Sequence, residues 1–249
     1  MKKNSFISRC ATYKNTYFID KPNEDVIIND DSRGIYILLD GVSVDRVKGK
    51  YPDPSPALIA SRLFSENVYK YLINSGNKTD CNLLIEEAIK FANKKLALLN
   101  MQYKFPFNAG TVGIIAIINN NYLYYSYIGD CFGRIVSDTG TKVFTEEQTY
   151  LVKIHKKELK TNEIRFSICN NMHHPYGYGV FDGSQGALDF VRSGKLHIKE
   201  NDIIILSSDG YEEYLKDILY PVPEDILTRA QYTIDKVDDR SILIIKREK

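Results

Sequence analysis

Four acidic positions stand beside short apolar segments in a similar way. Asp40 and Asp209 each end an apolar run, whereas Asp25 and Asp238 each come just before one. An aspartate at a strand end is short and rigidly placed, so several such ends on one rim of a sheet gather negative oxygens. That cluster is costly without a counter-charge, and divalent cations supply one. Hard carboxylate oxygens favour Mg²⁺ or Mn²⁺ over zinc.

Glycine follows two of these aspartates, at Gly41 and Gly210. Glycine leaves room for a metal ion or its water near the backbone carbonyl. Asp-Gly is also a common turn pair, and at any single position a turn is at least as good an interpretation. Four acidic positions at strand ends, in this order along the chain, favour the metal-ligand interpretation.

Short apolar runs rich in β-branched and aromatic residues predict the strands that carry these positions. The first strands are 26–28 and 34–39, and the closing strand is 241–245. Three further pairs have turn residues between them and are predicted to be hairpins. These pairs are 111–118 with 122–128, 133–136 with 142–144, and 195–198 with 203–207.

Two long helices are predicted between the early and the late strands. Ser55 and Pro56 suit the N-cap and first position of a helix over 57–73, which Gly76 would end. A second helix over 82–99 has apolar residues on one face, and a shorter one is expected over 146–159. Strands followed by helices and then by antiparallel strands indicate the α+β class.

The ordered series of motifs resembles the type 2C (PPM) family of metal-dependent protein serine/threonine phosphatases, as a bacterial-type member. Each motif alone is weak, but the ordered set is specific and spans about Arg9 to Lys246. The motifs are Asn23-Glu24-Asp25, Asp40-Gly41, Ala109-Gly110-Thr111, Ile128-Gly129-Asp130, Ser207-Ser208-Asp209-Gly210 and Asp238-Asp239-Arg240-Ser241.

The resemblance implies one phosphatase-like catalytic domain over residues 1–249. Its expected architecture is a four-layer αββα sandwich, with two antiparallel β-sheets flanked by pairs of helices. The resemblance also implies two Mg²⁺ or Mn²⁺ ions at one end of the sandwich. A water shared between two such ions loses its proton near neutral pH and attacks phosphorus in line.

The resemblance assigns a role to each acidic position. Asp40 would bridge both ions, and Asp209 with Asp238 would complete the coordination of one. The Gly41 carbonyl would help to bind the other ion, with Glu24 and Asp25 contacting it directly or through water. The predicted catalytic residues are Asp25, Asp40 and Asp209.

Two neighbouring acidic residues receive other roles. Asp239 stands where many family members have asparagine, so Asp238 is preferred as the ligand. Asp130 is expected to order the nearby loop.

Two positions depart from the family pattern. Asp20 stands where members usually carry an arginine that grips phosphate, and Lys21 and Arg9 are the candidate substitutes. Residues 106–108 lack the acidic residue that binds a third metal ion in many bacterial members, so no strong third site is expected.

Charge and composition exclude some classes of partner and location. The 249 residues include 33 basic and 32 acidic ones, a formal net charge of +1, which indicates neither nucleic acid nor a membrane as main partner. No apolar run approaches membrane-spanning length, and no secretory signal is apparent. The four cysteines are widely spaced, which fits reduced thiols in a cytoplasmic protein.

The predicted function is therefore hydrolysis of phosphoserine and phosphothreonine in signalling. The expected partners are a phosphorylated protein substrate and a Ser/Thr kinase that the phosphatase opposes. Two alternatives stay open. One is a catalytically weak member that acts as a phosphoprotein-binding or regulatory module, and the other is a phosphatase for a small phosphorylated metabolite.

Overall fold

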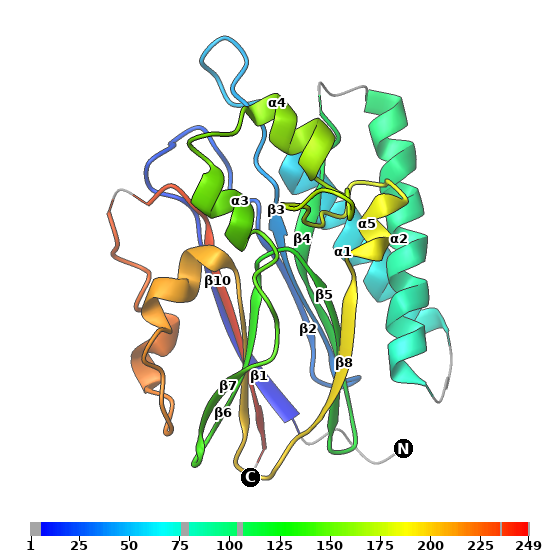
Figure 1. The fold of residues 1–249 in the computed structure, drawn as a ribbon. Helices are drawn as coiled ribbons and strands as arrows, with labels where there is room; N and C mark the ends of the chain where they lie inside the picture. Colours follow the sequence, from blue (N-terminus) through cyan, green and yellow to red (C-terminus); the bar gives the residue numbers. More distant parts are fainter. Residues whose placement is uncertain (1–5, 76–79, 104–106, 235, 249) are drawn as a thin grey trace.

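Two five-stranded antiparallel sheets form the centre of the molecule (Figure 1). The computed structural model describes residues 6–75, 80–103, 107–234 and 236–248. Sheet A has the order β1 (Phe6–Tyr13), β10 (Arg240–Arg247), β9 (Ile203–Ser207), β6 (Phe132–Ser137) and β7 (Gly140–Val143). Sheet B has the order β2 (Val26–Asp30), β3 (Ile35–Gly41), β4 (Thr111–Asn119), β5 (Tyr122–Ile128) and β8 (Arg192–His197).

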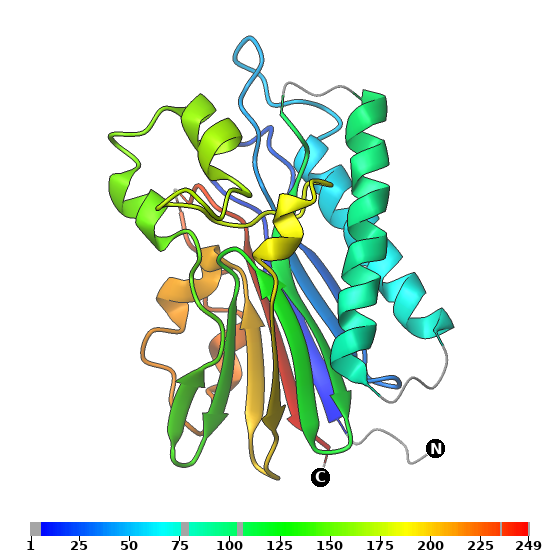
Figure 2. The ribbon, with the colours of Figure 1, turned by 45° about the vertical axis from the view of Figure 1, so that its right-hand side comes forward.

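Two long helices, α1 (Pro56–Asn74) and α2 (Cys81–Tyr103), cover the outer face of sheet B (Figure 2). The predicted start of α1 is confirmed, because the Ser55 hydroxyl accepts a hydrogen bond from the Leu58 amide at 3.1 Å. Gly76, its predicted end, lies outside the described residues. Phe64 and Val68 of α1 are fully buried in the core between this helix pair and sheet B.

The outer face of sheet A is covered by short turns of 3-10 helix, η2 (Asp209–Tyr214) and η3 (Glu224–Leu227). Tyr211 and Ile226 from these turns pack with Ile205 and Ile242 of the sheet in a second apolar cluster. The predicted fold class and layer order are confirmed, but no long helix pair lies on this face within the described part of the chain. Prolines at 221 and 223 interrupt helix propagation there.

One predicted hairpin is wrong. The sequence predicts that 195–198 pairs with 203–207, but β8 pairs with β5 whereas β9 pairs with β10 and β6. The chain therefore crosses from sheet B to sheet A at this point. The Ile198 amide donates to the Asn121 carbonyl at 2.7 Å, and Asp202 accepts from the Lys199 amide at 2.8 Å. A short polar turn of this kind serves a crossing as well as a hairpin, and the sequence does not distinguish them.

The helix predicted over 146–159 is shorter in the structure. Only α3 (Tyr150–His155) forms within that range. Three short elements follow it along the chain: α4 (Thr161–Glu163), a π-helical turn η1 (Ile164–Ile168) and α5 (Gly186–Asp189). The residues before Tyr150 hold the β5–β6 corner instead. Gln148 and Gly129 exchange two hydrogen bonds of 3.0 Å, one from each backbone amide.

Antiparallel pairing brings the acidic strand ends to one end of the sandwich, the end that carries α3 and α4 in Figure 1. Val26 is opposite Leu39, so Asp25 and Asp40 are adjacent in sheet B. In sheet A, Ser207 is opposite both Ile242 and Phe132, so the ends of β9, β10 and β6 meet at that same end. Among the described residues, no helix is long and apolar enough to cross a bilayer.

Candidate active site

Asp25, which is buried, and Asp40, which is half-buried, form the centre of the candidate site. Asp25 Oδ2 accepts a hydrogen bond from the Ser208 hydroxyl at 2.9 Å, which joins sheet B to sheet A. Burial, and then the charge of Asp239, raises the pKa of Asp25 to about 7. Burial, and then the charges of Asp25 and Asp209, raises the pKa of Asp40 well above its usual range. Like charges held out of water resist ionisation, so this cluster is poised to accept a cation.

Asp209 lies at the end of β9 and begins η2. Burial, and then the charge of Asp130, raises its pKa to about 6, although the Lys153 ammonium opposes that shift. An ion pair between Arg134 and Glu212 anchors η2 to β6, with Arg134 Nη1 at 2.7 Å from Glu212 Oε1. Asp209 is thus held at a fixed strand end rather than on a free loop.

Glu24 is fully buried, and its carboxylate has hydrogen-bond partners on both oxygens. Oε1 accepts from the hydroxyls of Tyr51, at 2.6 Å, and Ser55, whereas Oε2 accepts from the Ser43 hydroxyl at 2.8 Å. Lys21 Nζ also lies 3.3 Å from Oε2. The structure therefore places Glu24 beside Asp25 as the centre of a network that holds the loop after β3 and the start of α1.

The two aspartates before β10 differ in environment. Asp239 is buried and accepts hydrogen bonds from the Asn15 amide at 2.7 Å, the Glu24 amide at 2.9 Å and Lys21 Nζ at 3.2 Å. Asp238 is exposed, and its charge contributes to the raised pKa of Asp209. The described residues include no hydrogen-bond or ion-pair partner for Asp238. The Asp238 carboxylate is open to solvent, whereas that of Asp239 accepts these three hydrogen bonds.

The two predicted glycines make close backbone approaches. A Cβ at Gly210 would lie 2.1 Å from the Asp239 carbonyl oxygen, and a Cβ at Gly41 would lie 2.9 Å from the Glu24 Cβ. Real Cβ atoms do not come this close to other atoms, so both positions require glycine as the backbone stands. Gly210 lets η2 pack on the start of β10, and Gly41 lets the end of β3 pack on the Asn23-Glu24-Asp25 segment.

The chemistry of these donors fits a Mg²⁺ or Mn²⁺ ion. All the predicted ligands are oxygens, which both ions prefer. Asp25 Oδ1 is buried and has no hydrogen-bond partner in the described part of the chain, and a cation would satisfy it. As the side chains stand, no three acidic, histidine or cysteine side chains of the described residues converge on one point. The donor set therefore fits such an ion, but side chains must move to enclose it.

Asp130 orders its loop, as predicted. Its Oδ2 accepts a hydrogen bond from the Thr149 hydroxyl at 2.9 Å and lies 3.0 Å from Lys153 Nζ. Lys153 Nζ is also 3.1 Å from Asp209 Oδ2 and 2.9 Å from Glu147 Oε1. Lys153 could not be predicted from the sequence, because nothing in the spacing of its expected helix distinguishes it from the solvated lysines that follow.

The position expected to grip phosphate carries an ion pair instead. Asp20 accepts a hydrogen bond of 2.8 Å from Arg46 Nη1 and one of 3.0 Å from the Tyr51 amide. The two proposed substitutes lie elsewhere: Lys21 is buried between Glu24 and Asp239, and Arg9 lines a separate cavity over sheet A. Arg46, which the sequence did not single out, is the cation that the structure brings to Asp20.

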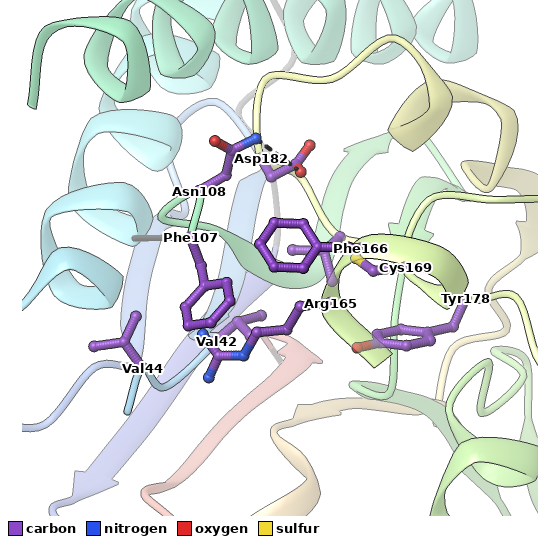
Figure 3. Close-up of a pocket in the computed structure, with 10 residues that line it drawn as sticks. Val42, Val44, Phe107, Asn108, Arg165, Phe166, Cys169, Tyr178 and Asp182 are labelled. Atoms are coloured by element: carbon purple, nitrogen blue, oxygen red, sulfur yellow. Dashed lines mark hydrogen bonds between the residues drawn. The ribbon is translucent and has the colours of Figure 1, made fainter. Parts of the chain in front are cut away.

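A cavity of about 160 Å³ lies beside the acidic strand ends (Figure 3). Val42, which directly follows Asp40-Gly41, lines it together with Val44, Phe107, Asn108, Arg165, Phe166, Cys169, Tyr178, Val180 and Asp182. The Arg165 guanidinium stands 4.1 Å from the centre of the Phe107 ring and donates to the Ser43 carbonyl at 3.2 Å. The cavity thus combines apolar walls with one cation and one carboxylate.

Comparison with solved structures identifies the fold. The chain superposes on the Mycobacterium tuberculosis serine/threonine phosphatase PstP/Ppp with a TM-score of 0.72 and 16% identity, over 98% of this chain and 99% of that one. The catalytic domain of the serine/threonine protein phosphatase PstP in complex with two manganese ions gives a TM-score of 0.70 and 17% identity, over 97% and 98%.

A third solved structure has the same arrangement. It is the PPM Ser-Thr phosphatase MsPP from Mycobacterium smegmatis in complex with cacodylate, with a TM-score of 0.65 and 14% identity over 97% of this chain and 98% of that one. No protein-family model and no curated protein matches this sequence. The predicted resemblance to the type 2C (PPM) phosphatases is therefore confirmed at the level of the fold.

Proposed function

We propose that this chain, as one domain over residues 1–249, is a metal-dependent phosphatase that hydrolyses phosphoserine and phosphothreonine in proteins. The observation that carries the proposal is that three separate strand ends bring the buried Asp25 and the half-buried Asp40 and Asp209 to the same end of the sandwich. Each of the three carboxyl groups has a raised pKa because desolvation and the charges of neighbouring aspartates oppose its ionisation. The shared fold with Ser/Thr phosphatases, one solved with two manganese ions, supports it further.

The proposed roles follow from where each group lies. Asp40, at the centre of the charges, would hold both Mg²⁺ or Mn²⁺ ions, and Asp209 with the exposed Asp238 would hold one of them. Asp25, whose Oδ1 lacks a partner among the described residues, would serve the other ion, with Glu24 and the Gly41 carbonyl beside it. Bound ions would supply an acidified water and charge neutralisation at the phosphoryl group.

The neighbouring cavity supports a peptide rather than a small metabolite as substrate. Phe107 and Phe166, whose ring centres lie 5.3 Å apart, provide an apolar wall next to Val42 and therefore close to Asp40. A side chain flanking a phosphorylated residue would find apolar contact there. A phosphorylated protein is thus the proposed substrate, and a Ser/Thr kinase would be the enzyme that this phosphatase opposes in signalling.

Hydrolysis of p-nitrophenyl phosphate tests the proposal. The wild type is expected to turn over this substrate with Mn²⁺ and to stop when EDTA is added. Asp209→Asn should lose the Mn²⁺-dependent activity, whereas Asp217→Asn, at an exposed aspartate, should keep it. Absence of metal-dependent turnover in the wild type would exclude the proposed enzymatic function. A panel of phosphopeptides and phosphorylated metabolites then compares kcat/KM between the two substrate classes.

A binding module without turnover is the second candidate function. The ion pair of Asp20 with Arg46 favours it, because an acidic residue occupies the position where an arginine was expected to grip phosphate. Calorimetric titration with a phosphopeptide and its unphosphorylated counterpart distinguishes the two functions. Phosphate-dependent binding without product release would support the module.

A further inference from the structure

Lys153 places a positive charge inside the cluster of acidic strand ends. Its Nζ lies 3.0 Å from Asp130 Oδ2, 2.9 Å from Glu147 Oε1 and 3.1 Å from Asp209 Oδ2. The three carboxylates come from the β5–β6 corner, the segment before α3 and the end of β9. One ammonium therefore joins the segment before α3 to the β5–β6 corner and to the end of β9.

The position of Lys153 is fixed by how α3 begins. The Lys153 amide donates to the Thr149 carbonyl at 2.9 Å, which places this residue in the first turn of the helix. The Thr149 hydroxyl donates to Asp130 at 2.9 Å, and Gln148 is hydrogen-bonded to Gly129. The start of α3 is thus held at the corner that carries Asp130, and the Lys153 side chain extends from there to Asp209.

Asp209 Oδ2 has no other cationic partner in the described part of the chain, and its repulsion with Asp130 and Asp238 would grow if the ammonium left. A divalent ion on Asp209 would compete for the same carboxylate and would repel an ammonium about 3 Å away. The Lys153 side chain is 43% exposed, so it can turn into water at small cost.

We propose that Lys153 is a built-in competitor of the divalent ion: it neutralises Asp130 and Asp209 in the metal-free protein and is displaced when an ion binds Asp209. The proposal rests on the metal site of the proposed function. It adds that metal binding is weakened by this lysine and is coupled to α3. When an ion displaces the ammonium, α3 loses its ion pairs to Asp130, Glu147 and Asp209.

Mn²⁺ titration calorimetry measures the competition directly. Lys153→Met removes the charge and keeps most of the side-chain length, and it is expected to bind Mn²⁺ about three- to tenfold more tightly than the wild type. Lys153→Arg keeps the charge and should bind at wild-type affinity or more weakly. Lys157→Met, at an exposed lysine just beyond α3, is the matched control and should leave the affinity unchanged. Circular dichroism melting of each variant verifies folding.

Hydrogen exchange of the α3 amides measures the coupling independently of activity. Mn²⁺ is expected to speed exchange over 150–155 in the wild type. In the Lys153→Met variant the same amides should exchange faster than in the metal-free wild type, and adding Mn²⁺ should not change their exchange rates. If Lys153→Met leaves Mn²⁺ affinity within about twofold of the wild type, or weakens it, the proposal is overturned while the metal site stands.

Further outcomes distinguish a failure of the proposed competition from a failure of the metal site. If only Lys153→Met binds Mn²⁺, the competition is supported in its strongest form. If none of the four proteins binds Mn²⁺, the competition and the metal site of the proposed function fail together. A folded Lys153→Met variant with unchanged Mn²⁺ affinity but raised KM for p-nitrophenyl phosphate would make Lys153 a substrate contact and would also overturn the proposal.

Discussion

Asp40 lies close to three other aspartates, Asp25, Asp209 and Asp130. Desolvation, and then the charges of these aspartates, raises the pKa of Asp40, whereas the Lys21 ammonium lowers it. Its backbone carbonyl accepts a hydrogen bond from the Thr111 hydroxyl at 2.7 Å, which fixes the strand end. A carboxylate held this rigidly in like charge is typical of a functional site, because folding alone would favour a neutral residue there.

Asp40→Asn tests that role at the level of one residue. The amide is nearly isosteric but neutral, so Mn²⁺-dependent hydrolysis of p-nitrophenyl phosphate should fall by at least about 100-fold. The folded state should be at least as stable, since an ionisable carboxyl group among like charges is replaced by a neutral amide. Asp138→Asn, in the exposed β6–β7 turn, should keep full activity. Equal activity of both variants would remove Asp40 from the site.

Gly210→Ala tests whether the backbone approach at η2 is required. The new Cβ would overlap the Asp239 carbonyl, so η2 must shift and take Asp209 with it. Unfolding by urea should show a loss of roughly 1–3 kcal/mol, together with lower Mn²⁺-dependent activity. Lys157→Ala, at an exposed position, serves as the control. An alanine variant with unchanged stability and activity would show that η2 accommodates the methyl group freely.

At the scale of elements, Ser55 connects helix α1 to the site. Its hydroxyl caps α1 through the Leu58 amide and also donates to Glu24. Ser55→Ala should cost roughly 1–2 kcal/mol in free energy of unfolding and should weaken Mn²⁺-dependent activity, since Glu24 loses a partner. Ser75→Ala, at the other end of α1, lacks a contact to Glu24 and should leave activity unchanged. A drop of activity in both variants would point to general destabilisation of the helix.

Local pattern predicts most elements of this fold, because each strand and helix has its own apolar periodicity and its own turn or cap. The hairpin of β4 and β5 and the cap at Ser55 are examples. The partner of an edge strand is not local: β8 joins β5 because of where the chain crosses between sheets. The extent of α3 depends on hydrogen bonds between Gln148 and Gly129, which no helical periodicity encodes.

In the candidate site, too, some residues could be predicted from local sequence and others could not. The positions of Asp40 and Asp209 at strand ends could be predicted because each follows an apolar run and precedes glycine, and their metal-binding roles stay predictions. Lys153 and Arg46 could not, since a lysine in a helix and an arginine in a loop are usually solvated. Their carboxylate partners are more than 20 residues away in the sequence, apart from Glu147, and only the three-dimensional structure brings them together.

At the scale of the whole molecule, the raised pKa values of Asp25 and Asp209 make the stability of the metal-free protein depend on pH. The pKa of Asp25 is about 7 in the folded state against a usual value of 3.8, and that of Asp209 is about 6. Because these folded-state pKa values lie above the usual ones, the folded protein binds these protons more tightly than the unfolded chain. Their contribution is therefore largest at low pH and is lost as pH rises towards 7.

Chemical unfolding in EDTA measures this dependence. Between about pH 5 and pH 8 the wild type should lose roughly 2 kcal/mol or more of unfolding free energy, at about 1.4 kcal/mol for each unit of pKa shift. The Asp25→Asn variant should lose clearly less unfolding free energy over that pH range. A wild type whose stability is flat or rises with pH, or an Asp25→Asn variant with the same slope, would contradict the burial of these charges.

The central claim is that the acidic strand ends hold divalent ions, and Mn²⁺ titration calorimetry of the wild type and Asp40→Asn tests it most directly. The wild type should bind two Mn²⁺ ions per chain, and Asp40→Asn should lose both, because this carboxylate is proposed to bridge them. A wild type that binds no Mn²⁺, or an Asp40→Asn variant that binds Mn²⁺ as the wild type does, would contradict the claim.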